Sequence, residues 1–196
     1  MKRRAVFLDR DGNINRDVGY PNSYDLIEIY PYSFEAVRKL NFAGFLAVII
    51  TNQSGIGRGL IPEKKLLDIH ARMKADFEQH HAVIDGVYYC PHYLPSPDPE
   101  YGRECSCRKP HPGMGLQAAQ DLAIDPSRSF MIGDKVEDIQ FGLNLGTTPI
   151  LVLTGYGERS REQLAELGIN PAFIAPTLLD AVNWILAKET GHNQKE

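Results

Sequence analysis

The sequence predicts an α/β protein with a Rossmann-like, three-layer fold, in which helices cover both faces of a parallel sheet. Short apolar runs bounded by turn residues alternate with segments of helical periodicity along most of the 196 residues. Polar motifs stand directly after three of these runs. Because parallel strands are joined by crossover helices and carry ligands at their carboxyl ends, these observations together favour this fold class.

Five apolar runs are predicted strands, at residues 5–8, 46–50, 87–89, 130–132 and 150–153. A helix is predicted after Pro62, where apolar side chains recur three and four residues apart at Leu66, Ile69, Met73 and Phe77. The chain after residue 113 and the segment 136–145 are also compatible with helices. The apolar positions indicate a buried core, and this places the polar motifs at the sheet edge.

The chain length and its mass of 22.0 kDa suit a single domain, which we expect at residues 1–187 without a large cap domain. An insert at about residues 90–111 is rich in proline, glycine and charge and shows no clear period. An irregular segment of this size needs its own cross-link to hold one shape. The polar segment 188–196 is expected to be a frayed tail.

The charge and composition exclude several classes of protein. A net charge of −4 argues against nucleic-acid binding, which normally needs a basic face. No apolar stretch approaches the roughly 20 residues of a membrane span, and the apolar run after Arg4 is too short for a signal peptide. Three cysteines, an odd number, do not suit a disulfide framework. We expect a cytoplasmic monomer with reduced thiols that acts on a small molecule.

The polar motifs after the first, second and fourth strands are Asp9-Arg10-Asp11-Gly12, Thr51-Asn52-Gln53-Ser54 and Gly133-Asp134-Lys135. Asp9 and Asp11 are two residues apart, and Gly12 allows the chain to turn so that both acids enter a cleft. A calcium loop is the alternative for this spacing. An EF-hand counted from Asp9 would need glycine where Ile14 stands and glutamate where Tyr20 stands, so the pattern does not fit calcium.

A carboxylate nucleophile such as Asp9 would be repelled by a phosphate monoester. Two unit charges about 4 Å apart repel by roughly 4 kcal/mol at an effective dielectric constant of about 20. Cations must therefore be supplied. Asp134 can join Asp9 in holding Mg²⁺, while Lys109 and Lys135 can contact phosphate oxygens and Thr51 can donate a hydrogen bond. Taken alone, the adjacent acid and lysine at residues 134 and 135 could be a surface ion pair.

The glycine-rich run 55–59 does not support nucleotide binding, because Leu60 occupies the position of the third glycine of the dinucleotide fingerprint. A Walker A pattern is also missing from the sequence.

The insert carries three thiols and one imidazole, at Cys90, His92, Cys105 and Cys107. Their number and softness match a closed tetrahedral zinc site, which is usually structural. Unliganded thiols and redox pairing are the alternatives. His111 is a competing ligand, but it lies beyond Arg108, Lys109 and Pro110, a poor distance for chelation together with Cys107, so His92 is the better choice. Because Arg108 and Lys109 directly follow the last cysteine, we expect zinc to hold them at the cleft.

The ordered set Asp9-x-Asp11-Gly12, Thr51, Lys109 and Gly133-Asp134 with Asp138 resembles the haloacid dehalogenase-like phosphatases. The resemblance covers nearly the whole chain. It implies that Asp9 is the nucleophile and Asp11 the general acid and base. It also implies that Mg²⁺ binds Asp9, the backbone carbonyl of Asp11, and Asp134.

Several strings are similar to a narrower branch of that family, the zinc-containing phosphatases of heptose bisphosphates: residues 9–15, 51–56, 89–92, 105–114 and 133–135. This resemblance implies removal of the 7-phosphate of D-glycero-D-manno-heptose 1,7-bisphosphate, in the synthesis of nucleotide-activated heptose for bacterial surface polysaccharide. It implies that Thr51, Arg108 and Lys109 contribute to catalysis. The implied substrate contacts are Asp17, Val18, Gly19, Tyr20, Thr51, Asn52, Gln53, Ser54, Arg108, Lys109 and Lys135.

The sequence is compatible with three alternatives. Histidinol-phosphate phosphatases share the acid pair and the zinc insert, so the sequence separates the two substrates poorly. A non-catalytic phosphosugar-binding protein would have no need of a nucleophile at Asp9. A transferase or mutase would need a cap that keeps water from the aspartyl-phosphate, and the chain has no second domain's worth of residues.

Overall fold

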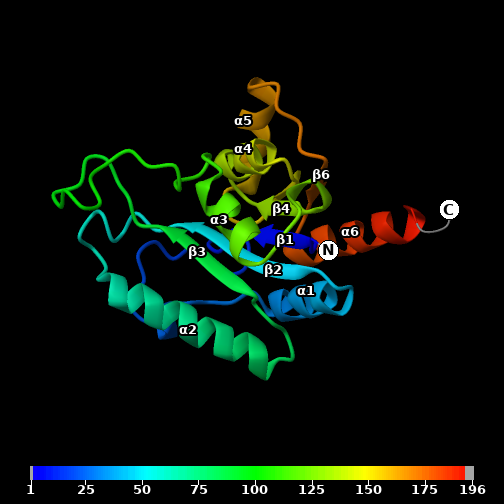
Figure 1. Ribbon diagram of the computed structural model, residues 1–196, viewed down its shortest axis with the longest axis horizontal. Coiled ribbons are helices and arrows are strands. Elements are labelled where there is room, and N and C mark those ends of the chain that lie inside the picture. Colours follow the sequence, from blue (N-terminus) through cyan, green and yellow to red (C-terminus); the bar gives the residue numbers. More distant parts are fainter. Residues whose placement is uncertain (1, 193–196) are drawn as a thin grey trace.

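The computed structural model describes residues 2–192, which form three layers around one six-stranded sheet (Figure 1). All strands are parallel and lie in the order β3-β2-β1-β4-β5-β6. The strands are β1 (Ala5–Leu8), β2 (Leu46–Asn52), β3 (Gly86–Cys90), β4 (Phe130–Gly133), β5 (Thr148–Val152) and β6 (Phe173–Ala175). The strand order reverses at β1, and in open sheets of this kind the ligand crevice lies at the carboxyl ends beside that point.

Helices cover both faces of the sheet, and each face has its own apolar core (Figure 1). One face carries α1 (Pro31–Phe42), α2 (Glu63–Gln79) and α6 (Leu178–His192). The other carries α3 (Gly113–Asp121), α4 (Val136–Leu145) and α5 (Gly157–Glu166). Side chains of β1 alternate between the two cores, because successive residues of a strand point to opposite faces.

The predicted strands and the predicted helices at α2, α3 and α4 are confirmed, with β5 beginning two residues earlier than expected, at Thr148. Helices α1, α5 and α6 and strand β6 were not predicted from the sequence. The strand β6 is only three residues long and lies at the sheet edge, so it carries little periodic signal. Its pairing with β5 forms only when the chain has folded.

The segment 91–112 connects β3 to α3 without a helix or strand and projects beyond the sheet (Figure 1). Within residues 2–192 no second domain is inserted. The expected boundary at residue 187 falls inside α6, which continues to His192, and residues 193–196 of the expected tail lie outside the described part. Among the described helices, none has the length and apolar character needed to cross a bilayer.

Candidate active site

A tight turn follows β1 and separates the first two acids. The amides of Ile14 and Asn15 both donate to the carbonyl of Arg10, at 2.9 and 3.1 Å, and Gly12 adopts a left-handed φ of +91°. A Cβ added at Gly12 would collide with the carboxylate of Asp134. Glycine therefore provides both the backbone conformation and the space that lets this turn pack against β4.

Three buried carboxylates, those of Asp9, Asp134 and Asp138, come together at the carboxyl ends of β1 and β4. One oxygen from each lies within 4.8 Å of the others. The Oδ2 of Asp134 accepts a hydrogen bond from the amide of Tyr156 at 2.7 Å, whereas its Oδ1 is buried without a partner in the described part of the chain. A buried carboxylate oxygen without a donor, beside further carboxylates, suits a hard divalent cation such as Mg²⁺.

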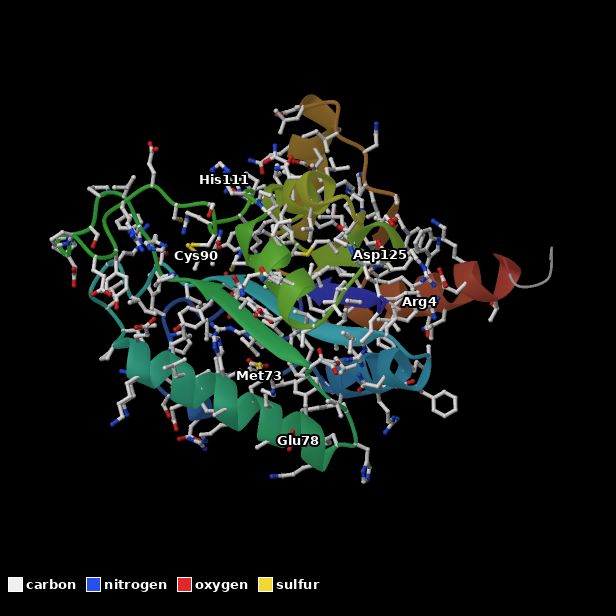
Figure 2. The ribbon with its side chains drawn as sticks, viewed as in Figure 1. Arg4, Met73, Glu78, Cys90, His111 and Asp125 are labelled. Atoms are coloured by element: carbon white, nitrogen blue, oxygen red, sulfur yellow. The ribbon has the colours of Figure 1, made fainter. Side chains whose placement is uncertain are left out.

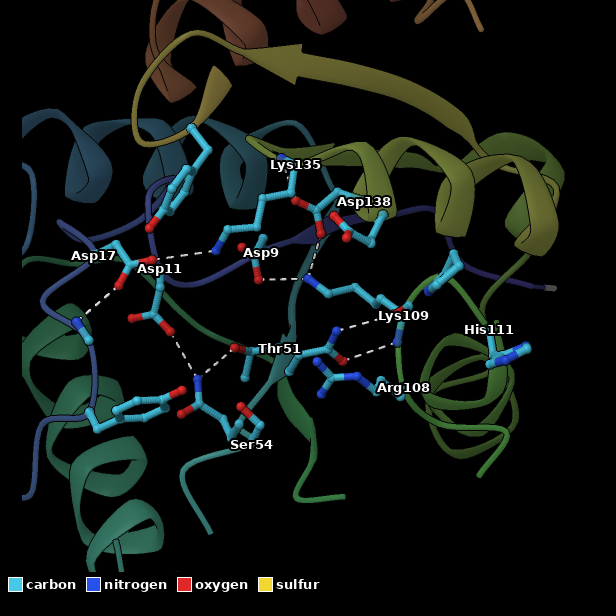
Figure 3. Close-up of a pocket in the computed structure, with 17 residues that line it drawn as sticks. Asp9, Asp11, Asp17, Thr51, Ser54, Arg108, Lys109, His111, Lys135 and Asp138 are labelled. Carbon is cyan, nitrogen blue, oxygen red and sulfur yellow. Dashed lines mark hydrogen bonds and ion pairs between the residues drawn. The ribbon is translucent and has the colours of Figure 1, made fainter. Parts of the chain in front are cut away.

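Lys109 lies between two of these acids (Figure 3). Its Nζ is 2.7 Å from Oδ1 of Asp9 and 2.6 Å from Oδ1 of Asp138, and it donates to the carbonyl of Ile50 at 3.0 Å. Burial opposes the charge of this ammonium group, but Asp138 and Asp9 outweigh burial and raise the pKa of Lys109. The side chain is therefore a fixed positive charge beside Asp9.

The backbone of Lys109 is held by Asn52 at the end of β2. The side-chain amide of Asn52 accepts a hydrogen bond from the Lys109 amide at 3.0 Å and donates to its carbonyl at 3.3 Å. Across the cleft, Nζ of Lys135 is 3.5 Å from Oδ2 of Asp17 and lies 5.1 Å from the centre of the Tyr156 ring. The two lysines thus approach the acids from opposite sides (Figure 3).

Burial raises the pKa of Asp9, with Lys109 acting against it. Burial, followed by the charges of Asp9 and Asp138, raises the pKa of Asp134 to about 8. Like charges crowded in a dry site resist ionisation. A divalent cation among these carboxylates would relieve that repulsion, so the electrostatics agree with the donor set.

Asp11 does not join this cluster. Its carboxylate accepts hydrogen bonds from Arg10 (2.8–3.1 Å), from Nδ2 of Asn15 at 3.0 Å and from Nε2 of Gln53 at 2.9 Å. Burial raises the pKa of Asp11, but Arg10 and the other donors overcome it and hold the pKa below its usual range. The same Gln53 amide donates to Oγ1 of Thr51 at 2.8 Å.

A cleft of about 680 Å³ opens above these groups (Figure 3). Its lining includes Asp9, Asp11, Asp17, Gly19, Tyr20, Thr51, Asn52, Gln53, Ser54, Arg108, Lys109 and Lys135. The structure thus brings together the predicted substrate contacts except Val18, which is 40% exposed and does not line the cleft. Asp134 lies beneath the lining, fully buried.

The four predicted zinc ligands also come together. The three cysteines are free, and the Cys90 sulfur lies 3.1 Å from that of Cys107 and 3.6 Å from that of Cys105. Nδ1 of His92 is 3.2 Å from the Cys107 sulfur. Ligands around a tetrahedral zinc are about 3.5–3.8 Å apart, so the cluster is compatible with zinc. Cys90 lies at the base of the projecting loop (Figure 2).

Comparisons with known proteins agree with this geometry. A HAD-hydrolase-like family model matches residues 106–181. A D-glycero-beta-D-manno-heptose-1,7-bisphosphate 7-phosphatase of Pasteurella multocida is 44% identical over 154 residues, which are 78% of this chain and 83% of the relative. The chain belongs to this family of HAD-like phosphatases.

Other members of the family match over more of the chain. The phosphatase of the same name from Haemophilus ducreyi is 40% identical over 188 residues, 94% of this chain and all of the relative. A crystal structure of D,D-heptose 1,7-bisphosphate phosphatase from B. bronchiseptica, complexed with magnesium and phosphate, covers 94% of this chain and 99% of its own. Its TM-score is 0.82 at 33% identity. The chain is therefore a phosphoric monoester hydrolase, and these relatives do not favour the histidinol-phosphate alternative.

Some residues of the phosphatase site were missed by the sequence analysis or given a lesser part. Asp138 was identified only as part of the family pattern, yet its Oδ1 pairs with Lys109 and its Oδ2 accepts the Lys135 amide at 2.9 Å. Tyr156 follows β5 and lines the cleft, and its position after a strand end was an available signal. His111 also lines the cleft and lies outside the Cys/His cluster, as the sequence suggested.

Proposed function

We propose that this protein removes the 7-phosphate of D-glycero-D-manno-heptose 1,7-bisphosphate, with Asp9 as the nucleophile. The observation that carries the proposal is the pairing of Asp9 with Lys109 at the floor of a cleft that also presents Arg108 and Lys135. Relatives that are 40–44% identical to the chain over the aligned residues are named for this reaction. The product would be the heptose 1-phosphate, an intermediate for nucleotide-activated heptose.

In the first step, an oxygen of Asp9 attacks the phosphorus of the 7-phosphate and the bond from phosphorus to the C7 oxygen breaks. That oxygen belongs to an alcohol, a poor leaving group, so it takes a proton from Asp11 as it departs. Because the pKa of Asp11 is held low in the free protein, Asp11 takes up this proton as the substrate binds, when the negative charge of the phosphate raises its pKa. Lys109, which is already 2.7 Å from Asp9, offsets the repulsion between the carboxylate and the phosphate. Thr51 has a hydroxyl at the cleft wall that can donate to the transferring group.

In the second step, a water oxygen attacks the phosphorus of the aspartyl-phosphate while Asp11 takes the proton of that water. The bond from phosphorus to the Asp9 oxygen breaks, which releases inorganic phosphate and restores the carboxylate of Asp9. Each residue thus returns to its starting protonation state, as a hydrolytic cycle requires.

Asp9 and Asp134, with the Asp11 backbone carbonyl, are the proposed Mg²⁺ ligands. Bound there, the ion would supply positive charge to the phosphate oxygens during transfer. Asp138 is already engaged by Lys109 and the Lys135 amide, so we assign it to holding those cations.

The non-reacting phosphate is assigned to the end of the cleft formed by Arg108 and His111. Both side chains also line a neighbouring hollow of about 740 Å³ beside the Cys/His cluster. A planar guanidinium can grip a phosphate through two parallel hydrogen bonds. The proposed zinc would hold this end in place, because Cys107 directly precedes Arg108.

Release of phosphate from three substrates tests the proposal: both anomers of the heptose bisphosphate, and histidinol phosphate, in the presence of Mg²⁺. We expect strong turnover of a heptose bisphosphate and a loss of at least about 10³-fold in Asp9→Asn. A protein that turned over histidinol phosphate alone would contradict the substrate, and an active Asp9→Asn would contradict the mechanism. Asp68→Asn, on the exposed face of α2, is the control for the exchange of a carboxylate for an amide.

A further inference from the structure

Arg10 occupies an unusual place next to the proposed acid. Its side chain is fully buried and does not line the cleft, so it cannot contact a substrate. We infer that Arg10, supported by His70, is a positioning residue that orients the Asp11 carboxylate for proton transfer. The inference rests on the proposed role of Asp11 and adds a further part to the same site.

The geometry shows how Arg10 controls its neighbour. Its Nε lies 3.1 Å from both oxygens of Asp11, and Nη2 donates to Oδ2 at 2.8 Å. Adjacent side chains of an extended strand point to opposite faces, but the turn at Gly12 brings the Asp11 carboxylate within reach of this guanidinium. A planar fork that contacts both oxygens fixes the plane of the carboxylate as well as its position.

His70 holds the guanidinium from behind. Nε2 of His70, on α2, lies 3.0 Å from Nη1 of Arg10. Because a guanidinium can only donate, this ring nitrogen must accept, and the proton of the neutral imidazole is on Nδ1. The ring of His70 packs against that of Tyr89 on β3, with their centres 5.8 Å apart. The core thereby fixes Arg10, and Arg10 fixes Asp11.

Arg10 is the only one of the three donors to Asp11 that contacts both carboxylate oxygens. Asn15 reaches Oδ1 and Gln53 reaches Oδ2. Displacement of a reacting group by about 1 Å can cost roughly 100-fold in rate. Loss of the guanidinium fork should therefore impair the steps that need Asp11, while Asp9 and Lys109, which Arg10 does not contact, keep their arrangement.

The leaving group separates these steps. The heptose alcohol needs a proton from Asp11, whereas 4-nitrophenolate leaves without one, and both routes need Asp11 for hydrolysis of the aspartyl-phosphate. In Arg10→Lys we expect kcat on the heptose bisphosphate to fall by about 100-fold. With 4-nitrophenyl phosphate in rapid mixing, we expect a burst of about one nitrophenol per enzyme near the wild-type rate, then slow turnover.

Two further variants keep the test decisive. His70→Phe removes the acceptor of Arg10 with similar volume, and it should show the same burst with a loss of about tenfold on the heptose bisphosphate. It decides the question if Arg10→Lys does not fold. Arg72→Lys is the matched control. Arg72 lies on α2, as His70 does, but it is exposed and pairs with Asp25, so this variant should behave as wild type.

Wild-type turnover in Arg10→Lys and His70→Phe, or equal slowing of burst and steady state in them, would overturn the inference. Asp11→Asn distinguishes this failure from failure of the proposed function. If Asp11→Asn shows the burst and slow turnover, the role of Asp11 stands whatever Arg10 does. If Asp11→Asn turns over heptose bisphosphate like wild type, the role of Asp11 fails and the inference fails with it.

Discussion

At the scale of single residues, burial and charged neighbours decide the pKa of each acid in the site. Asp9 and Asp11 are two positions apart in the sequence and both are buried, yet the pKa of Asp9 is raised and that of Asp11 is lowered. Asp9 shares a dry site with two other acids, whereas Asp11 faces a guanidinium and two amides. The low pKa of Asp11 suits its proposed role as the base of the second step, and a divalent cation beside Asp9 would offset the raised pKa of the proposed nucleophile.

His70 offers a test of the buried network through pH. Burial, aided by the charge of Arg10, lowers the pKa of His70 to about 3, below the usual 6.5. Below pH 6.5 the His70 imidazole binds a proton in the unfolded chain but stays neutral in the folded chain. His70 therefore destabilises the fold as the pH falls from about 6.5 toward 3. At pH 5 the shifted pKa of His70 lowers the free energy of unfolding by about 2 kcal/mol.

The measurement is the free energy of unfolding by denaturant at pH 7 and pH 5, for wild type and His70→Gln. We expect the wild type to lose about 2 kcal/mol more than the variant between these pH values, since glutamine does not titrate. His81→Gln is the control, because the side chain of His81 is exposed just beyond the end of α2. Equal pH dependence in wild type and His70→Gln would contradict the assignment.

At the scale of elements, the turn after β1 depends on glycine for two separate reasons. Gly12 and Gly146 both adopt left-handed φ angles, +91° and +85°, but only a Cβ at Gly12 would meet another group, the carboxylate of Asp134. Gly146→Ala should therefore cost only backbone strain, about 1–2 kcal/mol. Gly12→Ala should cost more than that, because Asp134 or the turn must move.

We expect Gly12→Ala to lower both stability and the apparent affinity for Mg²⁺, and Gly146→Ala to lower stability alone. Thermal unfolding and Mg²⁺ titration of activity measure the two effects. If both variants showed the same Mg²⁺ dependence as wild type, the packing of the turn on Asp134 would have no part in the metal site.

The insert is the other element that the site depends on. Lys109 is tethered by the Asn52 amide at one side and, in our proposal, by zinc through Cys107 at the other. Removal of zinc with a chelator should release Arg108 and lower turnover of the heptose bisphosphate by about 10- to 100-fold. The sheet should keep most of its circular dichroism, because the loop contributes only the partly buried Cys105 and Cys107 to the margin of one core.

Elemental analysis should find about one zinc per chain, and restoring zinc to the chelated protein should restore activity. Full turnover in zinc-free protein would refute the structural role. A combined Asn52→Ala and Cys105→Ser variant should lose more activity than the sum of the two single losses in free energy, because each tether compensates for the other.

At the scale of the whole molecule, the parallel sheet gathers residues from distant parts of the chain at one edge. Asp9, Lys109 and Asp138 span most of the sequence, yet they lie within direct contact because β1 and β4 are neighbours and β2 lies on the other side of β1. The two cores make the edge rigid. Side chains of β1 are buried on both faces, so the ends of the strands have little freedom to move.

The extent of the domain can be tested by truncation. A chain that ends at Ala187 loses the last turn of α6 and the ion pair between Arg4 and Glu189. A partly exposed pair contributes about 1 kcal/mol or less, so we expect the melting temperature to fall by no more than roughly 4 °C, with kcat unchanged. Glu189→Gln in the full chain is the control for the ion pair, because it leaves the contacts of Arg4 with Phe45 and Ala43 in place. A truncated chain without activity would place the domain boundary beyond residue 187.

The sequence by itself determined the fold class and the edge of the sheet where the chemistry lies. Strands predicted from apolar runs end at Asp9, Thr51 and Asp134, and in a parallel sheet all carboxyl ends meet at one edge. The spacing of the cysteines and His92 was sufficient to predict their cluster, because four soft ligands in an irregular insert have little other reason to occur together.

Only the tertiary structure decided which partner each side chain at that edge contacts. The sequence could not show that Asp11 turns away from Asp9 toward Arg10, or that Val18 lies outside the cleft. Side-chain direction beyond a strand end depends on the dihedral angles of a few turn residues and on partners such as His70 and Gln53, which are distant in the chain. Strand periodicity stops where the strand stops, so that information arises only when the chain is folded.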